Sequence, residues 1–188
     1  MLFRSLPASV TIPIGAASVT LSVNPLTDAL AEGDEMVDLT ITSDAAHYTI
    51  AAASASVVIA DLPIDRWRFA KFGADANTRV IAGDLADPDG DGSLNLLEYA
   101  FGTDPHVSDA SPALAFVGSE LALIYRRSVA ATDVTFDVWA TTDFTRWSDA
   151  GESEQILSDD GIERIVRAVL PYSAGPQMFY RIEVTRGR

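Results

Sequence analysis

One stretch, Asp87 to Glu98, limits the local structure of this 188-residue chain more than any other. It reads D-P-D-G-D-G-S-L-N-L-L-E, with Asp at positions one, three and five, Gly at six, Asn at nine and Glu at twelve. Carboxylates on alternate residues converge on a common centre when the chain curls into a tight loop, and Gly92 permits the sharp turn at position six. Because clustered carboxylates repel one another, the stretch predicts a loop wound around a cation.

The spacing is that of an EF-hand calcium loop, which supplies most of the roughly six to eight oxygen ligands that Ca²⁺ takes. Asn95 would bind directly or through a water, Ser93 through its backbone carbonyl and Glu98 through both carboxylate oxygens. The alternative is a solvated acidic turn, because Asp, Pro and Gly are common in turns. The chain contains no second loop of this pattern, so we expect moderate affinity. The predicted calcium ligands are Asp87, Asp89, Asp91, Ser93, Asn95 and Glu98.

Charge and composition restrict the partners of the chain. Its formal net charge of −14 argues against binding to nucleic acid or to anionic membrane surfaces. The absence of cysteine removes disulfides and thiol chemistry without arguing against export. No apolar stretch approaches the length of a membrane helix, so we expect no membrane span, and no signal peptide is visible.

The composition changes along the chain predict a division into segments. The first residues, M-L-F-R-S, match the translated end of a sequencing adapter, and we interpret 1–5 as a non-native start. We expect a partial β-sandwich over 6–63, a helical linker with the calcium loop over 64–105, and an antiparallel β module over 106–188. The fold class predicted is therefore mainly β, with a helix, calcium loop and helix between two β regions.

The segment from Leu6 to Pro63 has the alternating pattern of strands. Val19, Leu21 and Val23 alternate with polar residues, as does a second run from Val37 to Ile41, and Ser56–Ile59 is a shorter apolar run. The segment contains seven acidic residues and no Lys or Arg, which favours a bound cation.

Three phrases in this segment, V-T-I-P-I-G-A-A-S-V-T-L-S-V, D-A-L-A-E-G-D-E and S-A-S-V-V-I-A-D, resemble the latter part of a Calx-beta domain. The resemblance implies a calcium site at one end of a sandwich. The first strands of that family, which carry further acidic ligands, are missing here. The ligands that the resemblance implies are Asp28, the carbonyl of Leu30, Glu32, Glu35 and Asp61. The alternative for this acidic turn is a solvated loop between strands.

Helical patterns flank the predicted calcium loop. A helix is expected from Pro63 to Gly73 and a second from about Leu94 to Phe101, with Gly102 past its end. We expect the aromatic face of the first helix to be covered by Leu94, Leu97 and Phe101, so that Trp67 is core rather than a sugar platform. With the loop, this region resembles the calcium-loop segments near the C-termini of large bacterial surface proteins, and is similar to half a dockerin and to thrombospondin type 3 repeats. A dockerin needs two such loops.

The last part of the chain returns to strand patterns. Strands are expected around Leu121–Tyr125, Val134–Val138, Ile165–Leu170 and Tyr180–Val184, with a hairpin turn at 159–161. Glu152 and Glu154 are expected in a polar loop. The phrases W-A-T-T-D-F-T-R-W and M-F-Y-R-I-E-V look like the small β module that often follows such a calcium loop.

The chain carries no catalytic motif: G-x-S-x-G, a phosphate-binding glycine loop, H-E-x-x-H and cysteine are all absent. Spacing does not exclude a glycosidase with distant carboxylates, but we expect no enzyme. The favoured interpretation is a non-catalytic calcium-binding adhesion or structural fragment of a secreted or cell-surface bacterial protein, monomeric, with calcium and a surface glycan or protein as partners. The alternative is an accessory carbohydrate-binding module of an exported hydrolase, using Trp139 and Trp147.

Overall fold

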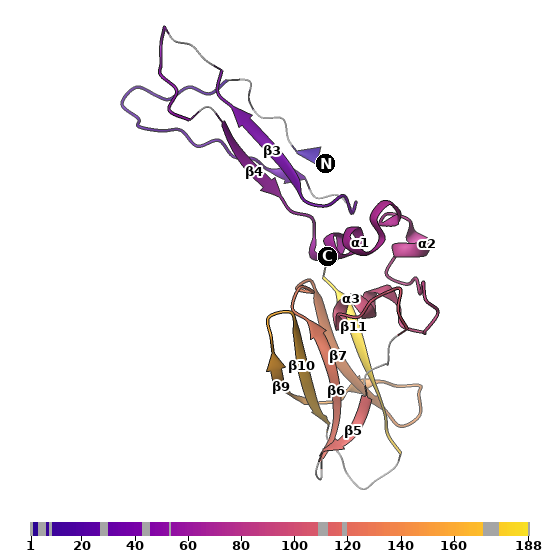
Figure 1. Cartoon of the computed structure of the whole chain (residues 1–188). Coiled ribbons are helices and arrows are strands. Elements are labelled where there is room, and N and C mark those ends of the chain that lie inside the picture. Colours follow the sequence, from indigo (N-terminus) through magenta and orange to yellow (C-terminus); the bar gives the residue numbers. More distant parts are fainter. Residues whose placement is uncertain are drawn as a thin grey trace.

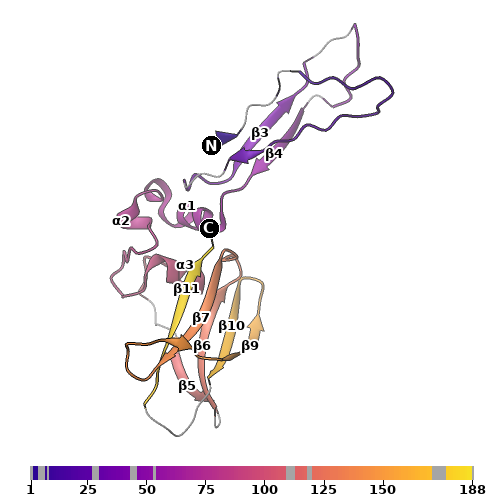
Figure 2. The same ribbon diagram turned by 180° about the vertical axis from the view of Figure 1, so that it is seen from behind.

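The computed structural model describes residues 2–3, 7, 9–26, 30–42, 46–52, 54–108, 113–117, 120–170 and 177–187. It is mainly β, as the sequence predicted. The described strands form antiparallel sheets of four, three, two and two strands, and the helices lie in the middle of the chain. An N-terminal ribbon, the helical region and a C-terminal sandwich follow one another along an extended molecule (Figures 1 and 2).

Two short ladders make up the N-terminal β segment. β1 (Leu2–Phe3) pairs with β2 (Pro25–Leu26), and β3 (Glu35–Thr40) pairs with β4 (Ser54–Ile59), each antiparallel. Neither hydrophobic cluster found among the described residues includes a side chain from this segment. In the part of the segment that is described, the two ladders are each two-stranded, and Ala31 and Val37 are buried.

The strand predicted at Val19, Leu21 and Val23 is wrong. The backbone there is irregular, and residues 11–20 are exposed to solvent. An alternating pattern forms a strand only where a neighbouring strand accepts its backbone hydrogen bonds. The ladders found along the described part of the chain include no partner for this run, so the pattern alone does not produce a strand.

The helical region contains α1 (Pro63–Phe72), the 3₁₀ turn η1 (Gly73–Asp75), α2 (Arg79–Ala82) and α3 (Asn95–Phe101). Both predicted helices are present. Pro63 lies in the first turn of α1, where its missing N–H costs no hydrogen bond. Gly102 ends α3 in the left-handed conformation, with φ of 76°, and its N–H donates to the Glu98 carbonyl. The short α2 was not predicted.

Helices α1 and α3 meet through aromatic side chains. Trp67 packs against Tyr99 with ring centroids 5.6 Å apart, and Ile64 and Tyr99 are both buried. The predicted cover was incorrect in detail, because Phe101 turns instead toward Tyr125 and Phe136 in the sandwich. Trp67 is a packing residue, as expected. Tyr99 thus joins the helical region to the C-terminal module.

The C-terminal module is an antiparallel β-sandwich, as predicted. One sheet has the order β5-β6-β10-β9 and the other β11-β7-β8. Their facing side chains form the main core, which includes Tyr125, Val138 and Val166. The strands are β5 (Ala113–Val117), β6 (Glu120–Ser128), β7 (Val134–Thr141), β8 (Ser148–Asp149), β9 (Ser153–Asp159), β10 (Glu163–Leu170) and β11 (Phe179–Arg186).

All four strands predicted in this module are present, and the turn at 159–161 joins β9 to β10. The prediction of a polar loop at Glu154 was wrong, because this residue lies on β9 and its carboxylate accepts a hydrogen bond of 2.6 Å from the Tyr125 hydroxyl. Every residue of β9 is exposed, so this edge strand lacks the apolar alternation that marks a half-buried strand.

Across the described residues, none of the helices is long and apolar enough to cross a membrane.

Candidate metal centre

The segment from Asp87 to Gly92 curls around the carboxylate of its first residue. Asp87 Oδ1 accepts a hydrogen bond from the Gly90 N–H at 2.9 Å, and Oδ2 accepts one from the Gly92 N–H at 3.0 Å. Gly90 and Gly92 have backbone φ angles of 74° and 93°, which residues with a Cβ rarely adopt. The glycine at position six therefore has the conformation that the predicted loop requires.

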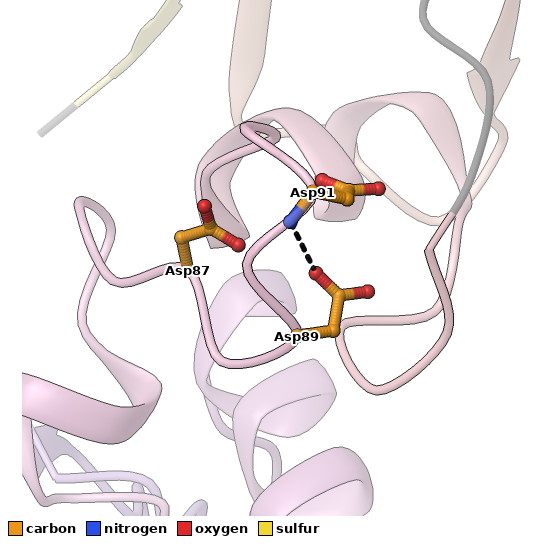
Figure 3. A group of neighbouring side chains, drawn as sticks. All are labelled: Asp87, Asp89 and Asp91. Carbon is orange, nitrogen blue, oxygen red and sulfur yellow. Dashed lines mark hydrogen bonds between the residues drawn. The ribbon is translucent and has the colours of Figure 1, made fainter.

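Three carboxylates converge at this turn (Figure 3). One oxygen each from Asp87, Asp89 and Asp91 lies within 4.8 Å of the other two, and all three residues are half-buried. Oxygens that bind one Ca²⁺ at about 2.4 Å lie at most about 5 Å apart. Asp89 Oδ1 accepts from the Asp91 N–H at 3.2 Å, whereas Asp89 Oδ2 is buried and has no hydrogen-bond partner. The cluster can hold a metal ion.

Glu98 adds a second, independent observation. Its side chain, on α3, is 1% exposed, and neither of its carboxylate oxygens has a hydrogen-bond partner. Burial raises the pKa of this carboxyl to about 7, with further increases from the charges of Asp89, Asp91 and Asp87. Glu98 lies outside the group of oxygens within 4.8 Å, but its charge interacts with all three members. A buried carboxylate without a partner is costly, and a cation between it and the aspartates would remove that cost.

The two remaining predicted ligands have different surroundings. Asn95 is buried, and its Nδ2 donates to the carbonyls of Ile81 and Gly83 at 2.9 and 3.0 Å, which ties the start of α3 to the end of α2. Its Oδ1 has no hydrogen-bond partner. The Ser93 N–H donates to Asp91 Oδ1 at 2.6 Å. Asn95 Oδ1 is thus a further buried oxygen that a metal ion, or a water bound to it, would satisfy.

The flanks of the loop are connected to elements on both sides. Asp84, just before the loop, pairs with Arg68 of α1 and, at 3.4 Å, with Arg186 at the end of β11. Arg68 also pairs at 2.8 Å with Asp65, which is 3% exposed and whose pKa is raised by burial. Sequence reasoning missed this network. Its members lie far apart in the chain, and the only signal was an acidic residue in the first turn of α1.

No protein-family model, curated protein or solved structure matches the chain. What the structure supports is a mainly β protein with an acidic cluster, Asp87, Asp89 and Asp91, between helices. The Calx-beta, dockerin and thrombospondin type 3 resemblances therefore remain predictions from sequence motifs.

The second predicted site is only partly described. Asp28 lies outside the described residues. Leu30, Glu32, Glu35 and Asp61 line one hollow of about 370 Å³. Asp61 Oδ2 accepts hydrogen bonds from the N–H groups of Glu32 and Gly33 at 3.0 and 2.8 Å. The Asp61 carboxylate therefore stabilises the turn at Glu32 and Gly33. Within the described part of the chain, these carboxylates do not form a close group like the one at Asp87, and calcium binding here stays a prediction.

Glu98 gives the metal-free protein a distinct pH dependence. Its pKa is about 7 in the folded chain against a usual value of 4.5, so between these values the folded state holds a proton that the unfolded state has lost. The free energy of unfolding should therefore fall as pH rises from about 4.5 through about 7. Urea unfolding with a calcium chelator at pH 5 and pH 8 measures this. The difference between the two pH values should shrink in Glu98→Gln, and an unchanged difference would contradict the assignment.

Proposed function

We propose that the segment Asp87–Glu98 binds one Ca²⁺ and that the ion rigidifies the joint between the N-terminal β segment and the C-terminal sandwich. The observation that carries this proposal is the buried Glu98 carboxylate, which lacks a hydrogen-bond partner beside three converging aspartates. All the donors are oxygens, which suits a hard cation. An irregular loop closed by a glutamate fits Ca²⁺ better than Mg²⁺, which demands a near-octahedral shell and keeps several of its waters.

The position of Glu98 supports a role in the joint. The next residue, Tyr99, is buried against Trp67, and its hydroxyl donates to Asp133 in the loop between β6 and β7. Gly102 lies beside Ser128, at a distance where an added Cβ would make an ordinary van der Waals contact of 3.5 Å with the Ser128 Cβ. An ion that holds Glu98 therefore fixes the helix that docks on the sandwich.

The N-terminal side is held to the same helical region. Asn77 Oδ1 accepts from the Ala31 N–H at 2.8 Å, and Asn77 Nδ2 donates to the Ala31 carbonyl at 3.1 Å. Arg66 pairs with Asp34 at 3.1 Å, and Phe69 lies against Gly33. Ala31 is buried by these contacts. Ordering the helical region thus orders its contacts with both β regions.

The setting that fits this role is outside the cell. Extracellular calcium is high enough to keep a loop of moderate affinity occupied, so the ion acts as a permanent structural part. We propose a non-catalytic adhesion or scaffold segment of an exported bacterial multidomain protein, monomeric in itself. The motif resemblances and the absence of catalytic motifs from the sequence support this proposal.

Thermal unfolding in calcium and in chelator tests the proposal. With calcium near a thousandfold excess over its dissociation constant, binding should stabilise the fold by about 4 kcal/mol, which corresponds to a rise in melting temperature of roughly 10 °C. Magnesium at the same concentration is the matched control and should give a much smaller rise. Coincident melts in calcium and chelator would overturn the proposal. Calorimetry should find one ion per chain, and two would indicate that the site near Asp61 also binds.

A further inference from the structure

A cluster of aromatic side chains lies on one side of the C-terminal sandwich. Phe144 is 60% exposed and lies in the loop between β7 and β8, which projects from the sandwich (Figure 2). Its ring contacts Phe179 at the start of β11, with centroids 3.9 Å apart, and lies 6.2 Å from Trp147. Met178, which precedes Phe179 in the chain, is 38% exposed. We call Phe144, Trp147 and Phe179 the aromatic platform.

The loop that carries Phe144 is held in a strained conformation. Phe144 has φ of 59°, the only positive value among the described residues other than glycine. This conformation is unfavourable for an aromatic residue, and such outliers persist where the surrounding structure enforces them. The Phe144 ring is exposed to solvent, so packing in the hydrophobic core does not account for its strained backbone. The backbone therefore places this ring outward.

Hydrogen bonds within the loop fix that conformation. The buried Thr141 Oγ1 accepts from the N–H groups of Asp143 and Phe144 at 3.2 and 3.1 Å. Asp143 Oδ1 in turn accepts from the N–H groups of Thr145 and Arg146 at 2.8 and 3.1 Å. The exposed Phe144 ring thus lies on a turn whose backbone is already fixed by hydrogen bonds. This reduces the conformational entropy that ligand binding would cost.

Polar groups border the platform. The Arg181 guanidinium lies 4.4 Å from the centroid of the Trp147 ring and pairs at 2.9 Å with Glu183 on the same strand. With Asp143, these side chains offer both donors and acceptors beside an aromatic surface. A pyranose ring requires this combination, because it presents C–H groups on its faces and hydroxyl groups at its edge.

We propose that the aromatic platform binds a ring of a neutral polysaccharide. The net charge of −14 disfavours sulfated and uronic acid polymers. One exposed ring and two half-buried rings offer far less than the roughly 800 Å² per partner of a stable protein interface, which favours a small ligand unit over a protein or a second copy of the chain. The two tryptophans predicted as sugar ligands are less suited than Phe144. Arg181 lies over one face of Trp147, so Trp147 supports the edge of the platform beside the exposed Phe144, and the Trp139 Nε1 is buried.

Affinity electrophoresis of the full chain in calcium buffer tests this proposal, with gels that contain β-glucan, xylan or galactomannan. At least one of these polymers should retard the wild-type protein, and alginate, a polyanion, should not. The informative variant is Phe144→Gly, because glycine adopts the left-handed backbone readily and the turn is kept. It should lose affinity roughly tenfold. The control Tyr48→Ala removes a ring that is 46% exposed in the N-terminal β segment and should bind like the wild type.

Three outcomes would overturn the proposal. The first is no retardation on any of the three neutral polymers. The second is equal retardation of the wild type and Phe144→Gly, with both melting at the same temperature. The third is a dimer in analytical ultracentrifugation that Phe144→Gly abolishes, which would assign the platform to a second copy of the chain. None of these outcomes depends on the calcium loop, so failure here leaves the proposed joint intact.

Discussion

Glu98→Gln should lower the affinity for calcium roughly a hundredfold, because removing one partner of a buried ion contact costs about 3 kcal/mol. The amide keeps the shape of the side chain and removes its charge. Without calcium the effect should have the opposite sign. At pH 8 the wild-type carboxylate is buried, ionised and without a hydrogen-bond partner, so the neutral variant should be more stable by about 1 kcal/mol or more.

Two measurements separate these effects. Isothermal calorimetry gives the calcium affinity, and thermal unfolding in chelator at pH 8 gives the stability of the metal-free fold. Glu152→Gln, which makes the same change of charge in the C-terminal module, is the control and should alter neither quantity. Unchanged calcium binding in Glu98→Gln would remove this residue from the ligand set. Lower stability of that variant in chelator would contradict the unpaired state of the carboxylate.

Tyr99→Ala should destabilise the protein by about 3–5 kcal/mol, the usual cost of deleting a large buried aromatic side chain. Because the ring anchors α3 against Trp67 and the sandwich, the same change should weaken calcium binding without touching a ligand. Tyr99→Phe keeps the ring and loses only the hydrogen bonding of the hydroxyl to Asp133 and the Ala130 carbonyl, so it should cost about 1 kcal/mol and leave calcium binding nearly unchanged.

Urea unfolding gives the stability of these variants and calorimetry gives their calcium affinity. Tyr48→Ala removes a tyrosine that is 46% exposed and should change both values little. Normal calcium affinity in Tyr99→Ala would show that the loop forms independently of the docking of α3. That result would refute the coupling between the ion and the joint, while leaving the calcium site itself in place.

The parts of the fold that the sequence predicted well depend on short-range signals. Pro63 and Gly102 mark where α1 begins and α3 ends, and the alternation in β6 and β10 gives strands because both pack against a second sheet. The run at Val19 has the same alternation but finds no partner strand in the described structure, and the chain there is irregular. Pattern alone therefore predicts a strand only where the rest of the chain supplies a neighbour.

The candidate site was predictable for a similar reason. The ligand spacing from Asp87 to Glu98 lies within one continuous segment, so sequence order almost fixes spatial order. The pairs of Arg68 and Arg186 with Asp84 join residues far apart in the chain, and no local pattern marks them. Phe144 was also missed, because its importance lies in a left-handed backbone angle that composition does not reveal.

The end of β11 lies beside the helical region, where Arg186 pairs with Asp84 (Figures 1 and 2). Mechanical tension applied between α1 and Arg186 would therefore act across a short distance, on the ion pairs around the calcium loop. Most of the sandwich would lie outside the path along which the force acts. In such a geometry the contacts of Asp84 with Arg68 and Arg186 would be loaded before the core of the sandwich.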